Sequence, residues 1–450
     1  MLSRKALGCR AALLLGLLAL LVPAMLNGFP LVFADSGGYL ARPFERTLAL
    51  GRSAFYGLFL AAGIPFDFWP NILIQAGLTV WIIRIVLREL GWPGPGVFVL
   101  VMIALTVFTS LPWYAGELMP DIFVPLAVLA FHVLAFARTG LRNREAMLLG
   151  GVIAAAVASH MSILGLVGAL LLFAFALLVV RQLVDLPRPH LSGPVAAVLS
   201  GILLALFSNL AIAGQFAFTP GGSTFLFARL LQDGIVARYL DDHCSDPGLR
   251  LCAFRAELPP TADDWLWGNS PLGKLGGWEE FEPEARRIIL RSIMDYPGAY
   301  IQSAFRATVE QLTTLATGEG MHSRDNWHAE AMLRKYAPDT LASFMASRQQ
   351  HDGFDFGLIN LVQVPVALAA TAMLPISIFL FRRSEPRLSR FTTTVLFAIL
   401  TNAAICGIFS NPNARYQSRI APLAVLSVLL ALLELWRAWK RNNVGRVSVA

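Results

Sequence analysis

Long apolar runs recur along this chain, and they constrain its fold more than any other feature. A helix needs roughly 20 apolar residues to cross the hydrocarbon core of a bilayer. Ten stretches approach that length: residues 8–26, 70–88, 96–112, 120–137, 146–158, 161–180, 193–213, 357–381, 391–410 and 418–436. We expect the first to be a retained helix, because no small-x-small cleavage site follows it. The sequence therefore predicts an all-α polytopic membrane protein with about ten transmembrane helices.

The composition supports the same class. Of the 450 residues, 56% are hydrophobic and only 14% are charged, and the mean hydropathy is +0.61. A soluble globular domain usually carries about 25% charged residues. A chain with so few charges is not expected to form one compact soluble domain.

The basic residues indicate how the helices are oriented, because Lys and Arg collect in short cytoplasmic loops. With a cytoplasmic N-terminus, the inner face holds 18 of the 36 basic residues but only 5 of the 29 acids. The basic residues are Arg4, Lys5, Arg10, Arg84, Arg88, Arg138, Arg142, Arg144, Arg181, Arg188, Arg382, Arg383, Arg387, Arg390, Arg437, Lys440, Arg441 and Arg446, and the acids are Glu89, Glu145, Asp185, Glu385 and Glu434. The net charge of +7 then reflects topology, and we expect no nucleic-acid partner. We expect a multi-pass protein of the bacterial inner (plasma) membrane with both termini cytoplasmic.

One large hydrophilic block, residues 214–356, separates the seventh apolar run from the eighth. The orientation above makes it extracytoplasmic. The expected organisation is a seven-helix membrane module over 1–213 carrying the first external loop, an extracytoplasmic loop domain over 214–356, and a three-helix membrane module over 357–450.

Two of the four cysteines, Cys244 and Cys252, lie in this block within "DDHCSDPGLRLC", and the other two lie in apolar runs. Disulfides persist outside the cytoplasm, so we predict a bridge between Cys244 and Cys252. The alternative is a metal site using His243, or His322 with His328. Their spacing matches no known ligand pattern, so we expect no metal and no cofactor.

Two further stretches of the block have a recognisable pattern. Residues 284–312 alternate apolar and polar side chains at helical spacing, which predicts two amphipathic helices hinged at Pro297. They would lie on the membrane surface or pack on the loop. The nearby Trp265, Trp267 and Trp278 fit either an interfacial aromatic belt or a stacking surface for sugar rings, and both readings stay open.

The acids that approach the membrane all fall at its expected outer face, and none lies at the centre of a predicted span. They are Asp35, Glu45, Asp67, Glu117 and Asp121. An ion-coupled transporter normally needs ionisable groups near the midplane, so this distribution disfavours one. His160, in "ASHMSILGL", is one of the strongest polar intrusions, and it fits a packing residue better than a proton relay.

Several motifs share one layout. An acid follows the first span in "FPLVFADSGGYL" (29–40), an external segment "RSAFYGLFLA" (52–61) precedes the second span, and "GELMPDIF" (116–123) opens the fourth. A long external loop follows the seventh span, and "NPNARYQSRIAPL" (411–423) precedes the last. This layout resembles the C-type glycosyltransferase (GT-C) superfamily, which includes protein mannosyltransferases and the aminoarabinose transferases of lipid A, and it covers most of the chain.

The resemblance implies that Asp35 is the base that takes a proton from the acceptor hydroxyl, while a polyprenyl phosphate leaves the anomeric carbon of the sugar with inversion. Phosphate is already a good leaving group, so one positioned base and nearby cations suffice. A guanidinium can grip phosphate through paired hydrogen bonds. Asp121 would orient the acceptor or the base, and the expected substrate-binding residues are Arg52, Tyr56, Glu117, His160, Arg415, Tyr416 and Arg419.

The chain departs from the superfamily at two points. Asp35 is followed by Ser36 and two glycines, where relatives often carry a second acid, so we expect a metal-independent enzyme. Many relatives have a basic residue where this chain has His160, so the role of His160 stays open.

Simpler roles compete at each site. Asp35 could cap a short helix. Asp121 could complement a helix dipole. Arg415 and Arg419 could anchor the last helix at the interface.

The expected function is transfer of a sugar from a polyprenyl-phosphate donor to a lipid, glycan or protein acceptor in the cell envelope, by an enzyme that also contacts membrane lipids. A lipid or glycan transporter, or a non-catalytic scaffold of an envelope-assembly complex, is the alternative.

Overall fold

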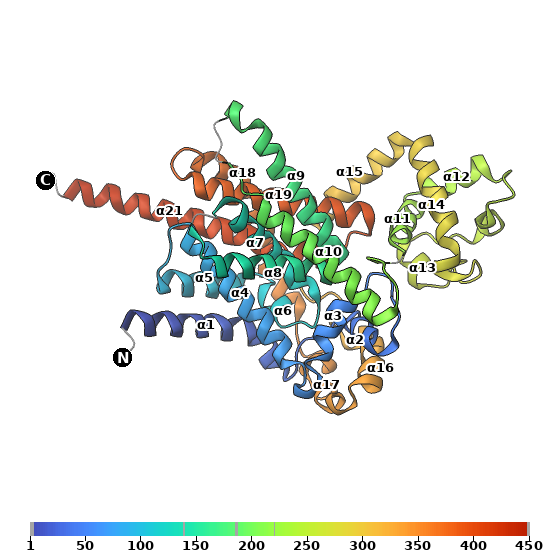
Figure 1. Ribbon diagram of the computed structural model, residues 1–450, viewed down its shortest axis with the longest axis horizontal. Helices are drawn as coiled ribbons and strands as arrows, with labels where there is room; N and C mark the ends of the chain where they lie inside the picture. Colours follow the sequence, from blue (N-terminus) through green and yellow to red (C-terminus); the bar gives the residue numbers. More distant parts are fainter. Residues whose placement is uncertain (1–3, 138–139, 185–187, 220, 448–450) are drawn as a thin grey trace.

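The structure is a computed structural model that describes residues 4–137, 140–184, 188–219 and 221–447. Its regular elements over these ranges are helices (Figure 1), and the only strand-like pairings there are two isolated bridges, Leu31 with Glu117 and Ala49 with Arg52. The all-α class is confirmed. Arg138 and Asp185, two of the residues used to predict the orientation, lie outside the described residues.

Seven helices in the described ranges are long and apolar enough to cross a membrane. They are α1 (Arg4–Asn27), α4 (Trp69–Glu89), α9 (Met161–Val184), α10 (Ser192–Ala213), α18 (Phe356–Phe381), α19 (Pro386–Phe409) and α21 (Pro422–Val447), the last preceded by the short α20 (Ala414–Ser418). Large apolar side chains such as Leu172 and Leu361 are at least 70% exposed on these helices, as expected for contact with lipid. The chain is therefore a multi-pass membrane protein by length and composition.

Three of the ten expected spans form shorter helices. α5 (Pro95–Phe108) and α7 (Phe123–Phe136) each have 14 residues, and α8 (Asn143–Ser159) has 17. The chain between α5 and α7 folds into α6 (Leu111–Ala115) and a 3₁₀ turn (Pro120–Ile122). A count of ten spans stays a prediction.

The helices pack around α7, which is buried along almost its whole length. Every residue from Phe123 to Ala135 is buried, and α7 packs against α4, α8, α9 and α19. A helix that is apolar on all sides belongs at the centre of a bundle. In Figure 1 the start of α1 and the end of α21 lie at the same end of the molecule, and α11–α14 lie at the opposite end.

The expected loop domain, 214–356, is built as two separately packed parts. The first part, which we call the knob, comprises α11 (Gly222–Gln232), α12 (Ile235–His243), α13 (Ala262–Trp267) and α14 (Gly277–Asp295). It has its own apolar core, in which Trp265 contacts the rings of Phe227 and Phe281.

The structure joins Cys244 and Cys252 of the knob in a disulfide. Trp265 is fully buried, so it serves neither as an interfacial residue nor as a sugar platform. Trp267 is exposed, and its ring centroid lies 5.9 Å from that of Trp278, so the two readings apply only to this pair.

The amphipathic stretch forms two helices that meet at Pro297, as predicted. α14 buries Phe281 and Ile288 in the knob. α15 (Pro297–Thr313) packs against α19 so closely that a Cβ on Gly407 would lie 2.5 Å from the Ala307 carbonyl oxygen. Packing on the loop therefore holds for α14, whereas α15 packs on α19, one of the long apolar helices.

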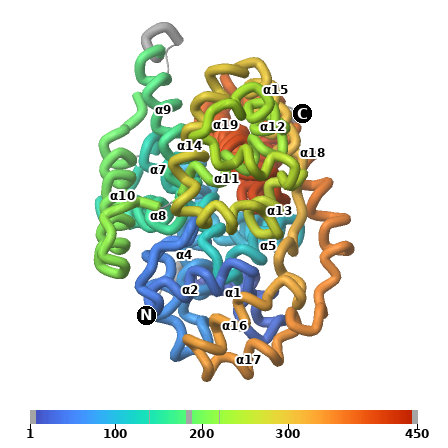
Figure 2. The backbone as a smooth tube through the Cα atoms, turned by 90° about the vertical axis from the view of Figure 1, so that its right-hand side faces the viewer, coloured from blue at the N-terminus to red at the C-terminus, as the bar shows by residue number. Residues whose placement is uncertain are grey.

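The second part of the block joins the main body. α16 (Trp327–Tyr336) and α17 (Leu341–Met345) lie near α2 (Ser36–Glu45), as Figure 2 shows, and α16 packs on α2. Ala329 and Phe344 belong to the same apolar core as the membrane helices. Buried Gln349 fixes the connection, because its side chain accepts from the Val32 N–H (3.0 Å) and donates to the Val32 carbonyl (2.5 Å).

We predict that Gly37→Ala destabilises the protein, because the added Cβ would lie 2.7 Å from Ala329 Cα where α16 crosses α2. Overpacking at such a contact costs about 1–3 kcal/mol. The matched control is Gly77→Ala in α4, where a Cβ meets nothing within 4 Å. Thermal unfolding in detergent should show a lower Tm for Gly37→Ala alone, and equal Tm values would contradict the packing described.

Candidate functional site

Asp35 occupies the N-cap position of α2, yet its side chain makes no capping hydrogen bond. The neighbouring Ser36 is used elsewhere, because its Oγ accepts from the Phe33 N–H (3.0 Å), which precedes the helix, and donates to the Leu118 carbonyl (3.1 Å). The Asp35 carboxylate is thus left to face two guanidinium groups. Arg52 Nη2 pairs with Oδ1, and Arg415 Nη1 lies 3.5 Å from Oδ2.

The glycines after Asp35 have separate structural reasons. Gly37 lets α16 approach, as described above, and Gly38 lies under Arg52, since a Cβ there would be 3.3 Å from Arg52 Nε. Arg52 immediately precedes Ser53, the N-cap of α3 (Ala54–Ala61), whose side chain accepts from the Tyr56 N–H. The motif "DSGGYL" and the nearby Arg52 therefore place a carboxylate and a cation together on the segment between α1 and α4.

Asp121 reaches the same place from the start of α7. The backbones of the two segments are joined, because the Leu31 N–H donates to the Gly116 carbonyl and the Leu118 N–H donates to the Leu31 carbonyl, both at 2.8 Å. The Asp121 side chain is 1% exposed, and its Oδ1 accepts from Arg419 Nη1 at 3.0 Å. Asp121 therefore neutralises a buried guanidinium, which is a larger structural role than complementing a helix dipole.

Arg415 connects the two acids. Its Nη1 pairs with Asp35, and its Nε lies 3.8 Å from Asp121 Oδ1. Its guanidinium also lies 4.1 Å from the centroid of the Phe33 ring, and the Tyr416 ring lies about 5 Å from both Arg415 and Arg419. Five residues thus form one acid–arginine cluster: Asp35, Arg52, Asp121, Arg415 and Arg419.

His160 borders this cluster as the C-cap of α8. The Ser162 N–H donates to His160 Nδ1 at 3.1 Å, which places the proton of a neutral imidazole on Nε2. Burial, together with the Arg419 charge, lowers the pKa of His160 to about 3. The Ser162 hydroxyl lies between Nδ1 (2.8 Å) and Arg419 Nη2 (3.2 Å) and links His160 to the cluster.

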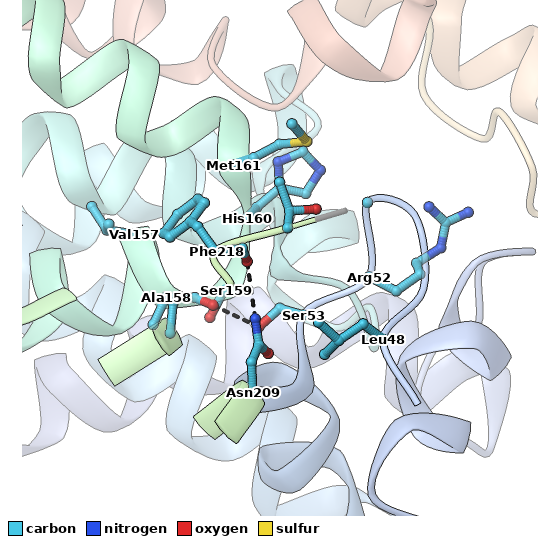
Figure 3. Close-up of a pocket in the computed structure, with 13 residues that line it drawn as sticks. Leu48, Arg52, Ser53, Val157, Ala158, Ser159, His160, Met161, Asn209 and Phe218 are labelled. Carbon is cyan, nitrogen blue, oxygen red and sulfur yellow. Dashed lines mark hydrogen bonds between the residues drawn. The ribbon is translucent and has the colours of Figure 1, made fainter. Parts of the chain in front are cut away.

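Two cavities flank the cluster. A narrow recess beside Arg52, Ser53, His160 and Asn209 has an interior of about 20 Å³, little more than a water molecule needs (Figure 3). In Figure 3 the Arg52 guanidinium points away from Ser53 and Asn209.

The second cavity, of about 860 Å³, lies on the Arg415 side of the cluster. Polar lining residues include Glu319, His322, Asp352 and Asn360. It touches the cluster through the backbone, because Glu319 Oε2 accepts from the Arg415 N–H at 2.9 Å. Its size is in the range of small-molecule sites.

Two of the expected substrate-binding residues are placed elsewhere. Tyr56 is fully buried beneath α2, where its hydroxyl donates to Gln75 Oε1 (3.0 Å) and its ring packs against Tyr39. Glu117 is also fully buried. Neither side chain is open to a substrate in this conformation.

Sequence reasoning missed Glu319, Ser162 and Gln349. Glu319 lies between Gly318 and Gly320, both with left-handed backbone (φ of +97° and +67°), and this "GEG" run was a usable signal for a tight turn that presents a side chain. Ser162 and Gln349 carry no comparable pattern, because their roles depend on partners far away in the chain.

This arrangement suits chemistry at one carboxylate surrounded by fixed cations. Asp35 is 25% exposed and can reach a substrate, whereas Asp121 and Arg419 are buried and hold the geometry. The described residues contain no group of three or more His, Cys, Asp or Glu side chains that could hold a metal ion.

Comparison of the chain with protein-family models, curated proteins and solved structures gave no match.

We predict that Asp121→Asn lowers stability sharply, because it leaves the buried guanidinium of Arg419 without its charged partner. Breaking a buried ion pair in this way costs about 3–5 kcal/mol. The control is Asp339→Asn at an exposed position. The Tm in detergent should fall only for Asp121→Asn, and an unchanged Tm would show that the pair carries no stability.

We predict that His160→Gln reduces the loss of stability in mild acid. The pKa of His160 is lowered from 6.5 in the folded protein, so the unfolded chain takes up a proton first as the pH falls below that value. The wild type should therefore lose about 1–2 kcal/mol at pH 5 that the variant keeps. Tm measured at pH 7 and pH 5, with exposed His190→Gln as control, checks this, and parallel curves would contradict it.

Proposed function

We propose that this protein is an integral membrane glycosyltransferase that moves a sugar from a polyprenyl-phosphate donor to a lipid, glycan or protein acceptor. The observation that carries the proposal is the Asp35 carboxylate, which is partly exposed, takes no part in capping and is held between Arg52 and Arg415. If Asp35 were only an N-cap, its carboxylate oxygens would accept hydrogen bonds from backbone N–H groups of the first helical turn.

In the proposed reaction the acceptor hydroxyl gives its proton to Asp35, and its oxygen attacks the anomeric carbon. The bond from that carbon to the phosphate oxygen breaks, and its electron pair leaves with the polyprenyl phosphate. The sugar configuration inverts because attack and departure occur on opposite faces. One base is sufficient, since the phosphate needs no proton to leave.

The arginines would serve the phosphate. In the structure Arg52 and Arg415 are paired with Asp35, and a bound phosphate would compete for both guanidinium groups. Their transfer to the phosphate would free the carboxylate to accept a proton when donor is bound. Arg419 would remain paired with Asp121, and the Tyr416 ring would stay packed against both Arg415 and Arg419.

The acceptor would enter through the 860 Å³ cavity, which is wide enough for a sugar or a lipid headgroup. The proposed setting is the bacterial plasma membrane, with about ten spans, cytoplasmic termini and the cluster on the extracytoplasmic side. The knob and the cluster would then share the outer face, and no cofactor is needed.

We predict that Asp35→Asn abolishes transfer without loss of folded protein. Loss of a general base typically costs 10²–10⁴-fold in rate. Envelope glycans and glycolipids are compared by mass spectrometry in a deletion strain complemented with wild type, Asp35→Asn, or the exposed control Asp263→Asn at matched protein level. One sugar increment should be missing only in the deletion and the Asp35→Asn strain.

Full activity of Asp35→Asn would overturn the proposed mechanism. If no sugar increment differs even in the deletion strain, transport or scaffolding becomes the better reading. Substrate movement that survives Asp35→Asn would then favour a transporter.

A further inference from the structure

Glu117 is a buried acid that the proposed mechanism does not use. Its side chain is 0% exposed, and neither carboxyl oxygen has a hydrogen-bond partner among the described residues. The backbone at this position is fixed, because the Glu117 carbonyl accepts from Gln75 Nε2 at 2.8 Å and the segment pairs with Leu31. A carboxyl group held in such a place requires a physical explanation, since an ionised one without partners is costly to bury.

Three further buried atoms without a hydrogen-bond partner in the described ranges lie in the acid–arginine cluster. Asp121 Oδ2, Arg415 Nε and Arg419 Nε also lack hydrogen-bond partners within the described part of the chain. Asp121 follows Glu117 by four residues and already engages both arginines through its other oxygen. Asp121, whose charge acts on Glu117, therefore has one oxygen left to accept a hydrogen bond.

Six ionisable groups interact electrostatically with Glu117: Asp35 at the start of α2, Tyr56 of α3, Tyr114 of α6, Asp121, Glu319 and Arg415. Three of them are acids and one is a cation. Burial raises the pKa of Glu117 well above its ordinary value, Asp121 raises it further, and only Arg415 opposes the shift.

We propose that Glu117 is a neutral positioning residue, whose proton is directed to Asp121 and whose lack of charge reserves Arg415 for Asp35 and Asp121. An ionised Glu117 would compete for Arg415, which has one guanidinium for two acids already. A neutral Glu117 has one O–H to donate, for which the unpartnered Asp121 Oδ2 is the proposed acceptor, and it leaves the ion pairs of the cluster intact. Its effect on activity rests on the proposed function, whereas its protonation does not.

The first test observes the proton directly. Infrared difference spectra of the purified full-length protein in lipid nanodiscs are recorded for wild type, Glu117→Gln and the exposed control Glu310→Gln at pH 7.5. The protonated-carboxyl C=O stretch should be present in wild type and Glu310→Gln and absent from Glu117→Gln. An identical band in all three proteins, or no band, would overturn the proposal.

The second test compares a neutral donor with an apolar side chain. Glu117→Gln keeps a neutral hydrogen-bond donor and should retain transfer activity within about 3-fold of wild type, whereas Glu117→Leu should lose at least about 10-fold, mainly in kcat. Activity of wild type should decline at alkaline pH as Glu117 ionises, and Glu117→Gln should not share that decline. A folded Glu117→Gln as inactive as Asp35→Asn would show that the charge is needed and refute the assignment.

The third readout is independent of activity. Since the pKa of Glu117 is raised in the folded protein, its burial costs stability increasingly as the pH rises above 4.5, the ordinary value. Glu117→Gln should match the wild-type Tm near pH 5 and exceed it at pH 8. A constant Tm difference across this range would contradict a neutral Glu117, and failure of the glycosyltransferase proposal would leave this result unchanged.

Discussion

The structure depends on how charges are paired at the ends of the membrane helices. Asp121 and Arg419 are 1% exposed, a placement that is tolerated only because each neutralises the other. Arg415 links that pair to Asp35, and Asp35 also pairs with Arg52. The segment after α1, the start of α7 and the residues that precede α21 are thereby held together by electrostatics rather than by shape alone.

Much of this organisation could be predicted from residue patterns. Apolar runs predicted the long helices, because a run of some 20 apolar residues has few other stable states in a membrane. The alternation over 284–312 predicted α14 and α15, and the site residues Asp35, Arg52, Asp121, Arg415 and Arg419 come together as one cluster. Each of these features is carried by a local pattern or by a charged residue next to an apolar run.

What could not be predicted depends on contacts between distant segments. The division of 214–356 into a knob and a part that packs on α2 rests on which core Trp265 and Phe344 join, and no local pattern reports that. The Glu319 side chain accepts a hydrogen bond from the backbone N–H of Arg415, and the Gln349 side chain accepts one from the backbone N–H of Val32. Because these partners are backbone groups, no complementary side chain in the sequence indicates either contact. Tyr56 and Glu117 were expected at a substrate surface, but both are buried, Tyr56 against Tyr39 and Gln75 and Glu117 where its backbone pairs with Leu31.

The cluster also has a consequence for how the chain is made. Asp121 is separated from Arg419 by 298 residues, and Asp35 from Arg415 by 380. At 5–20 residues per second, roughly 15–60 s pass between synthesis of Asp121 and synthesis of its partner. Until that segment is made, Asp121 lacks both arginine partners and Asp35 lacks Arg415. A nascent chain that stops before α20 would carry nearly all the membrane helices and still lack two of the three cations of the cluster.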